Sequence, residues 1–298
     1  MPGLDLQPLA GDLRAECAAL LAERYARQRA REPLLPAVDD FEPHLPPDGW
    51  VAVRDGTAVA YLAGEVDGDV ARVGFAGAAG SDADALTLCF VRCARVWDTQ
   101  RFAISVPAGD EALIDAFFRL AFGCQFAWGI RESEPAAPVD FGGTIRPGTR
   151  DDIDAAVDLE LELHALQTML PSWSGLPPAD REAVRTEWSS GWDDTSDWEH
   201  LVAERGGEIV GQVVLYQRPE GDLRVPPANI DLALMVTRLG DRGTGVGSAL
   251  VAHTLRRAHE QGYRSVTVDW RTVNPLAGPF WPRRGFRPQY LRLYRSVP

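Results

Sequence analysis

Lysine is absent from this 298-residue sequence, and all 30 of its basic residues are arginine. Schiff-base and pyridoxal enzymes depend on a lysine amine, and a P-loop places a lysine on its phosphates. The missing lysine therefore excludes these classes of enzyme. The net charge of -13 also argues against a nucleic-acid surface, because phosphate binding needs clustered positive charge.

Cysteine and long apolar runs are scarce. Cys17, Cys89, Cys93 and Cys124 all lie in the first half, without CxxC spacing or a histidine at metal-site spacing. We interpret them as small buried hydrophobes, with a redox or metal role as the alternative, and predict no metal site. No apolar run approaches the roughly 20 residues of a membrane helix, and no signal peptide is recognisable. We expect a cytoplasmic protein with no membrane partner.

The length predicts two domains of about 150 residues each, and the composition is that of an ordinary globular chain. Residues 51–60 and 202–211 each show apolar alternation around a glycine-containing turn, which predicts a β-hairpin in each half. Each half also begins with a short strand and an amphipathic helix, within residues 6–30 and 145–170. We infer a duplicated domain, with coincidence of short apolar patterns as the alternative. The Pro/Ala-rich residues 134–138 fit the linker, so we expect domains at 1–138 and 139–298.

The most informative stretch is residues 230–262, where an apolar strand is followed by Arg-Gly-Thr-Gly-Val-Gly (242–247) and then by an amphipathic helix. Glycines let a backbone approach a pyrophosphate closely, and free N–H groups at a helix N-terminus favour negative charge. A Rossmann fold would place such a turn early, in a parallel βαβ unit. Here the turn comes late, after antiparallel strands.

A further strand (265–270) and the run from Asn274 to Phe286 follow the turn. The order strand, Arg-x-x-Gly-x-Gly, helix, strand, Asn-x-x-Ala-x-x-Phe-Trp, Gly-Phe resembles the GNAT superfamily of acyl-CoA N-acyltransferases over the whole second half. The resemblance implies a mixed α/β (α+β) fold with two GNAT-like domains, each a V-splayed central sheet flanked by helices. It also implies acetyl-CoA as the acyl donor, held by Leu234, Met235, Val236, Arg242, Gly243, Thr244, Gly245, Val246, Gly247, Ser248, Asn274, Ala277 and Trp281.

The expected chemistry is attack of a primary amine on the thioester in a ternary complex. The family usually has a tyrosine where this sequence has Trp281, and an indole N–H is no useful proton donor. We therefore expect Trp281 to pack against the cofactor, with Tyr290 and Tyr294 as candidate substitutes for the acid. Candidate bases are Asp231 and Asp269, and further Glu162 or His164, with water-mediated deprotonation as the alternative.

The first half resembles the same fold without its cofactor equipment. Residues 74–81 carry no Arg-x-x-Gly-x-Gly, and Asp110 and Phe117 stand where Asn274 and Trp281 lie in the second half. We expect a degenerate copy that packs against the second half or shapes the acceptor site.

Between the first helix and the hairpin of the second half, indole rings and carboxylates are unusually dense. These residues are Trp173, Trp188, Trp192 and Trp198 together with Glu187, Asp193, Asp194, Asp197 and Glu199. Aromatic faces and carboxylates both attract an ammonium group, which predicts a small cationic amine as acceptor. Packing of the tryptophans against the first half is the alternative. Two rival functions stay open: a silent acyl-CoA-binding or regulatory protein, and an acyltransferase that uses a longer acyl-CoA.

Overall fold

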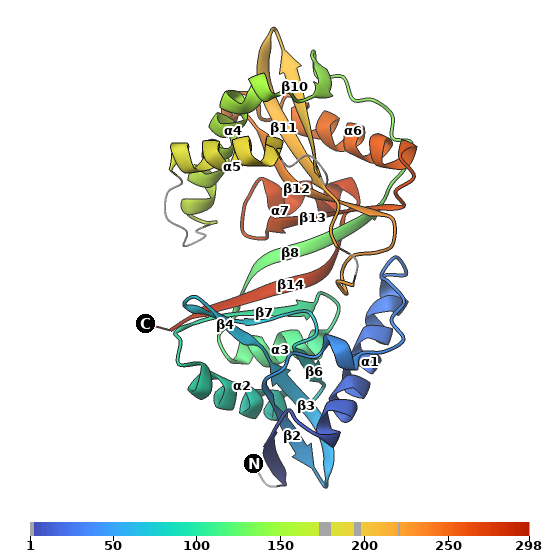
Figure 1. Cartoon of the computed structure of the whole chain (residues 1–298), viewed down its shortest axis with the longest axis vertical. Coiled ribbons are helices and arrows are strands. Elements are labelled where there is room, and N and C mark those ends of the chain that lie inside the picture. Colours follow the sequence, from blue (N-terminus) through green and yellow to red (C-terminus); the bar gives the residue numbers. More distant parts are fainter. Residues whose placement is uncertain (1–2, 173–179, 194–197, 220, 298) are drawn as a thin grey trace. The chain divides into compact units, whose positions relative to one another are not determined.

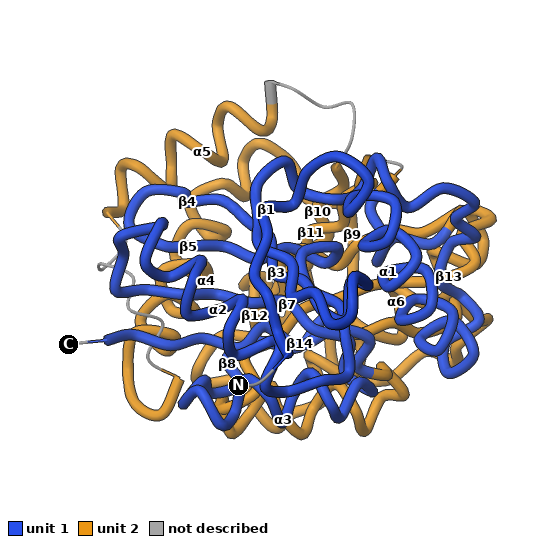
Figure 2. Tube along the Cα trace, turned by 90° about the horizontal axis from the view of Figure 1, so that it is seen from below, with its two compact units in different colours: residues 1–128, 222–226, 288–298 blue, residues 129–221, 227–287 orange. Residues whose placement is uncertain are grey.

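The computed structural model describes residues 3–172, 180–193, 198–219 and 221–297, and these form two compact units (Figures 1 and 2). Unit 1 comprises residues 1–128, 222–226 and 288–298, and unit 2 comprises residues 129–221 and 227–287. The predicted domain boundary at residues 138 and 139 stays a prediction; unit 2 begins at residue 129, and residues 222–226 and the C-terminal strand from residue 288 lie in unit 1. This strand, β14 (Arg287–Ser296), pairs antiparallel with β7 (Arg101–Pro107) from Tyr290 opposite Pro107 to Ser296 opposite Arg101.

Unit 1 contains a four-stranded sheet in the order β1-β2-β3-β6, formed by Leu4–Pro8, Gly49–Arg54, Thr57–Ala63 and Ala78–Gly80. A second group of strands has the order β4-β5-β7-β14-β8, in which β4 is Glu65–Asp67, β5 is Val70–Val73 and β8 is Gly123–Glu132. The helices are α1 (Asp12–Arg31), α2 (Ala83–Trp97) and α3 (Glu111–Arg119). The predicted hairpin is confirmed as the antiparallel pair β2–β3.

Unit 2 contains strands in the order β13-β12-β11-β10-β9, formed by Ser265–Arg271, Asn229–Thr237, Glu208–Tyr216, Trp198–Arg205 and Thr144–Pro147. Its helices are α4 (Ile153–Thr168), α5 (Arg181–Asp193), α6 (Val246–Glu260) and α7 (Ala277–Phe280). The second predicted hairpin is confirmed as the antiparallel pair β10–β11.

Helices cover both faces of the unit 2 sheet. Gln212 on β11 donates to the carbonyl oxygen of Ala156 on α4 at 3.0 Å, whereas a side chain at the preceding Gly211 would meet Val246 and Leu250 of α6. Successive strand residues point to opposite faces, so α4 and α6 lie on opposite sides of β11. Figure 1 shows the same arrangement.

The sheet of unit 2 is V-splayed. Strands β12 and β13 are parallel and pair only from Asn229 opposite Ser265 to Leu232 opposite Val268. On its other side β12 pairs antiparallel with β11 as far as Thr237. The last residues of β12 therefore have one edge that does not pair with β13, as the predicted fold requires.

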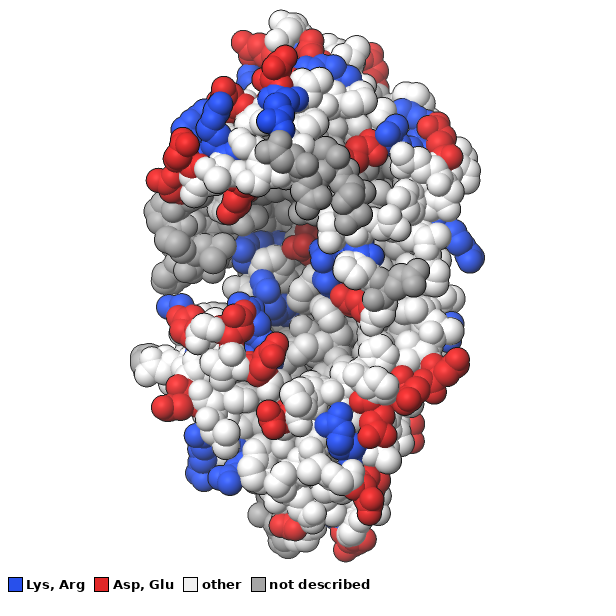
Figure 3. All heavy atoms as spheres, viewed as in Figure 1, with Lys and Arg blue, Asp and Glu red and all other residues white. Residues whose placement is uncertain are grey.

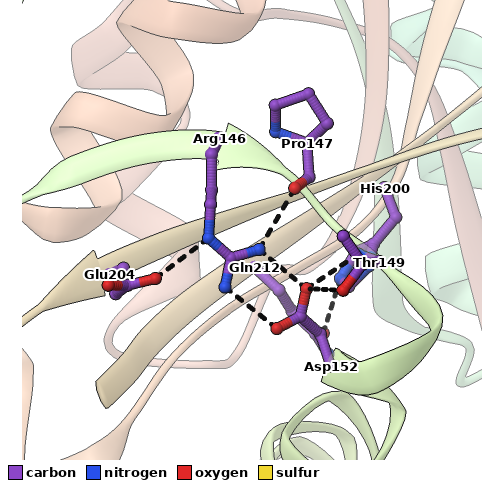
Figure 4. Close-up of polar contacts among 7 residues, drawn as sticks. All are labelled: Arg146, Pro147, Thr149, Asp152, His200, Glu204 and Gln212. Carbon is purple, nitrogen blue, oxygen red and sulfur yellow. Dashed lines mark hydrogen bonds and ion pairs between the residues drawn. The ribbon is translucent and has the colours of Figure 1, made fainter. Parts of the chain in front are cut away.

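An ion-pair network holds the start of α4 against the sheet (Figure 4). Arg146 on β9 donates to both carboxylate oxygens of Asp152, at 2.7 and 2.9 Å, and to Glu204 on β10 at 2.9 Å. The Thr149 backbone N–H donates to the Asp152 carboxylate and the Thr149 side chain accepts from the Asp152 backbone N–H, which together form a capping box at the entry to the helix. The Thr149 hydroxyl also donates to the Asp152 carboxylate at 3.0 Å. The Arg146 guanidinium lowers the pKa of Asp152 to about 2. This network fixes the helix whose later turns line the cavities described below.

Along the sequence, both halves follow one order of elements: strand, helix, hairpin, further strand, helix, strand, helix and final strand, with α5 as an additional helix in the second half. In unit 1 the strand that corresponds to β12 is divided, since β5 pairs in parallel with β7 whereas β6 pairs with β3. The shared order supports the predicted duplication.

Candidate functional site

A cavity of about 420 Å³ opens at the free edge of β12, and we call it the turn cavity. Its walls come from α4, the end of β12, the glycine turn, α6 and the segment around α7. It is lined by Leu163, Leu166, Met235, Val236, Thr237, Arg242, Gly243, Gly245, Gly247, Ser248, Asn274, Leu276, Ala277, Phe280, Trp281 and Arg284. Ten of the thirteen residues predicted to hold the donor are in this lining; Leu234, Thr244 and Val246 are not.

The glycine turn has a backbone that other residues rarely adopt. Gly243 has a φ of 80°, and Gly245, the N-cap of α6, has a φ of 96°. The N–H groups of the first helical turn have no acceptor within the helix and carry the positive end of its dipole. The first turn of α6 contains no acidic residue. This helix end can therefore accept an anion.

Arg242 supplies a cation beside the helix end. Its Nε donates to the Thr237 carbonyl oxygen at 3.1 Å, while Nη1 is buried and finds no acceptor among the described residues. Burial lowers the pKa of this guanidinium. A buried donor that lacks an acceptor costs about 1–3 kcal/mol, so a phosphate oxygen at this position would be stabilising. The turn thus fits the pyrophosphate of an acyl-CoA.

A second arginine, Arg205 on β10, contacts the outer side of the glycine turn. It forms an ion pair with Asp241 and donates to the Thr244 hydroxyl at 3.2 Å. The same hydroxyl donates to the Asp241 carbonyl oxygen at 2.7 Å. These contacts explain why the Thr244 side chain is absent from the lining.

The opposite wall is built around α7. Asn274 accepts hydrogen bonds from the backbone N–H groups of Leu276 (2.9 Å) and Ala277 (3.2 Å), and so caps this short helix. Trp281 is 5% exposed and packs edge-on against Phe280 and Phe286, with ring centroids 5.0 and 5.2 Å away. Trp281 therefore packs within the cavity wall, and its packing against a bound donor stays a prediction.

Sequence reasoning missed several lining residues. Arg284 lies over the Phe280 ring at 3.4 Å and also donates to the Ser248 hydroxyl, which places a further cation beside α6. The Arg-Arg-Gly-Phe string at 283–286 was the available signal for it. Leu163 and Leu166 come from α4, and no local pattern marks these two leucines as cavity residues.

Among the candidate bases, Asp231 is 4% exposed and already engaged. It pairs with Arg218 at 2.6 Å and accepts the hydroxyl hydrogen of Thr267 at 2.6 Å. Thr267 in turn accepts from Asn229, whose side-chain oxygen accepts from Ser265. This series of hydrogen bonds joins β12 to β13 in the region where the two strands pair. The contacts of Asp231 therefore favour a structural role.

The other candidates come from three elements, β13, α4 and β14. Asp269 is half-buried on β13, and Glu162 accepts the Leu239 N–H at 2.7 Å. His164 lies 3.5 Å from Glu160 on the same helix. Tyr290 and Tyr294 are on β14, in unit 1. Tyr290 is fully buried, and burial raises its pKa to about 12.

A second cavity in unit 2, of about 320 Å³, contains indole rings and carboxylates, and we call it the indole cavity. It is lined by Glu160, Glu187, Trp188, Gly191, Trp198, Val214, Tyr216 and Leu234. From the predicted indole and carboxylate set, Trp188, Trp198 and Glu187 are in this lining. Trp173, Asp194 and Asp197 lie outside the described residues, as does the side chain of Asp193. Glu199 instead forms an ion pair with Arg257 of α6.

The tryptophans form a cluster within unit 2. Trp198 makes T-shaped contacts with Trp188 and Trp192 at 5.9 and 5.2 Å, and the His200 ring lies 4.8 Å from Trp188. Burial lowers the pKa of His200 to about 4, so this imidazole is neutral at pH 7. These contacts join the rings of Trp188 and Trp192 on α5 to those of Trp198 and His200 on β10, so the described rings pack together within unit 2.

The corresponding helix end in unit 1 is closed. Asp82 caps α2, and its Oδ1 accepts the N–H groups of Asp84 and Ala85 at 3.0 Å each. These bonds lower the pKa of Asp82, and Arg54 donates to the same carboxylate at 2.6 Å. A carboxylate thus fills the place that an incoming phosphate would need at the N-terminus of α2.

Three further features concern metal ligands, membrane spans and surface charge. The described residues contain no group of three or more His, Cys, Asp or Glu side chains that could hold a metal ion. None of the described helices combines the length and apolar composition of a membrane span. On the face shown in Figure 3, arginines and acidic residues are interspersed, without the continuous basic surface that nucleic acid would need.

Comparison with known proteins finds one family model that matches part of the chain and solved structures with a similar fold. Residues 163–286 match the model of the acetyltransferase (GNAT) family. A GCN5-related N-acetyltransferase from Sphaerobacter thermophilus has a similar structure, with a TM-score of 0.63, 15% identity, and coverage of 99% of this chain and 96% of that one. A tandem GNAT protein from the clavulanic acid biosynthesis pathway has a TM-score of 0.50 at 16% identity, with coverage of 99% and 98%. No curated protein matches the chain. These likenesses show a tandem GNAT fold.

Proposed function

We propose, from the GNAT-family domain at residues 163–286, that the protein transfers an acetyl group from acetyl-CoA to the primary amine of a small cationic acceptor. The observation that carries the proposal is the turn cavity, in which Arg242 Nη1 and the α6 N-terminus offer donors to an anion. Family membership supports acyl transfer in general. The acetyl donor, the acceptor class and direct attack in a ternary complex are our proposals.

Acetyl-CoA supplies a thioester: the amine nitrogen forms the new C–N bond, the C–S bond breaks, and the CoA thiolate leaves and takes up a proton. Residues of this chain would bind and orient the donor. Arg242 and the first turn of α6 would hold its pyrophosphate, and the unpaired edge at Leu234, Met235 and Val236 would pair with its pantetheine arm. A backbone N–H near Val236 would stabilise the developing oxyanion.

Two protons must also move. Asp231 and Asp269 stay candidates for accepting the amine proton, although the contacts of Asp231 favour a structural role. Trp281 packs in the cavity wall, so we propose that water protonates the thiolate. Substitution of Tyr290 or Tyr294 by Phe tests the alternative acids.

The test is release of free CoA thiol from acetyl-CoA across a panel of amines, with mass spectrometry of the product and a parallel panel of longer acyl-CoA donors. We expect an acetylated amine and an equal amount of thiol. Binding of acetyl-CoA without any acyl product would favour the silent binding protein instead. Faster turnover with a longer acyl-CoA would show that this longer acyl-CoA, and not acetyl-CoA, is the preferred donor.

A further inference from the structure

The indole cavity combines two carboxylates with aromatic walls. Glu160 on α4 is 18% exposed in its side chain, and Glu187 on α5 is exposed. The rings of Trp188 and Trp198 stand at 76° to each other, with Tyr216 beside them in the lining. Carboxylates and aromatic faces both bind cations, whereas an anionic group would be repelled.

The two tryptophans that line the cavity, Trp188 and Trp198, both use their indole N–H groups in hydrogen bonds within the protein. The Trp188 indole N–H donates to Glu160 Oε2 at 2.7 Å, and the Trp198 indole N–H donates to the Gly191 carbonyl oxygen at 2.7 Å. The first bond fixes the Glu160 carboxylate at the cavity wall, where its other oxygen lies 3.5 Å from His164. The rings thus offer their faces to a ligand, while Glu160 offers a charge in a set position.

A nitrogen bound in this cavity would be a poor nucleophile. Nearby carboxylates favour the protonated form of an amine and raise its pKa. Attack on a thioester needs a neutral amine. The group that the indole cavity binds best is therefore a cation that does not react.

Two elements, α4 and β12, contribute residues to the linings of both the indole cavity and the turn cavity. On α4, Glu160 lines the first and Leu163 lines the second, and residues three apart on a helix lie about 5–6 Å apart. On β12, Leu234 lines the first and Met235 lines the second. Their side chains point to opposite faces of the strand, so at β12 the two linings meet only along the edge that does not pair with β13. A short, flexible molecule can therefore reach from one cavity to the other.

We infer that the acceptor carries two basic groups: a cationic group held by Glu160 and Glu187 between the indole rings, and a primary amine that reaches the turn cavity and is acylated. Short aliphatic diamines have this chemistry. The inference rests on the proposed function, since it assigns a substrate class to the same site.

The experiment compares 1,4-diaminobutane with butylamine and 4-amino-1-butanol, which keep one amine but lose the second charge. The diamine should have a kcat/KM at least on the order of tenfold higher, mainly through KM, because a charge-assisted contact is lost in the other two. In Glu160→Gln the ratio of kcat/KM for the diamine to kcat/KM for butylamine should shrink towards unity. The glutamine oxygen can still accept the Trp188 N–H, so the substitution removes the charge with little change in packing. Glu187→Gln should have a smaller effect in the same direction.

Glu182→Gln is the matched control, because Glu182 is exposed on α5 outside the cavity lining. It should leave the preference unchanged. Equal kcat/KM for diamine and monoamines in the wild-type protein would overturn the inference, and so would a preference that survives in the double variant Glu160→Gln/Glu187→Gln. Either result would leave acetyl transfer intact, whereas the absence of any acyl product would count against the proposed function itself.

Discussion

Arg242 donates through Nε to the carbonyl oxygen of Thr237 at 3.1 Å, and this bond holds its guanidinium at the mouth of the glycine turn. Nη1 of the same side chain is buried without an acceptor among the described residues. We expect Arg242→Gln to weaken acetyl-CoA binding by on the order of tenfold to a hundredfold, since a charge-assisted hydrogen bond contributes about 1.5–3 kcal/mol.

Calorimetric titration with acetyl-CoA measures this loss. Arg238→Gln serves as control, because Arg238 pairs with Glu208 at 2.7 Å and is not part of the cavity lining. Equal affinity in the Arg242 and Arg238 variants would remove Arg242 from the proposed anion site.

Trp281 should act through packing. Trp281→Phe is expected to keep most turnover, whereas Trp281→Ala should raise the KM for acetyl-CoA and destabilise unit 2 by about 3–5 kcal/mol through the cavity it leaves. Steady-state kinetics and urea unfolding measure the two effects. A Phe variant that folds normally but does not turn over at saturating acetyl-CoA would show that the indole does more than pack.

Asp231 should stabilise the parallel pair β12–β13 rather than accept the amine proton. Asp231→Asn removes the ion pair with Arg218 and weakens the bond from Thr267, which should cost about 1–3 kcal/mol of stability. We expect the pH profile of kcat/KM to keep its shape. If the variant folds but its kcat/KM no longer rises towards alkaline pH, Asp231 is the base.

The position of the glycine turn, the order of the elements along the second half of the sequence and the two hairpins were all predictable, because each depends on short local patterns in the sequence. Pairing of β14 with β7 was not predictable, since it joins residues some 190 positions apart. The same limit applies to the indole cavity. Glu187 and the tryptophans stood out by their density, whereas Glu160 and Tyr216 reach the cavity only through the packing of α4 and β11.

Stability should depend on pH through His200. Burial lowers the pKa of this side chain from 6.5 to about 4. Between these two pH values the imidazole binds a proton in the unfolded chain but not in the folded protein. The contribution of His200 to the free energy of unfolding is therefore fully present above pH 6.5 and is lost as the pH falls towards 4. We expect unit 2 to lose about 1–2 kcal/mol between pH 7.5 and pH 5.

Urea unfolding followed by tryptophan fluorescence reports on this region, because His200 contacts the indole cluster. In His200→Gln the decrease in the free energy of unfolding between pH 7.5 and pH 5 should become smaller, whatever the absolute stability of the variant. An unchanged pH dependence would assign the effect to other groups.

The central claim, that the glycine turn of unit 2 is the acyl-CoA site, is tested most directly by titrating acetyl-CoA into the wild-type protein, Gly245→Glu and Gly262→Glu. Gly245 and Gly262 both have positive φ, 96° and 85°, and flank the two ends of α6, so the variants match in backbone strain and added charge. We predict one acetyl-CoA bound per chain in the wild-type and Gly262→Glu proteins, and none in a folded Gly245→Glu. Unchanged binding in Gly245→Glu, or two sites per chain in the wild-type protein, would contradict the account.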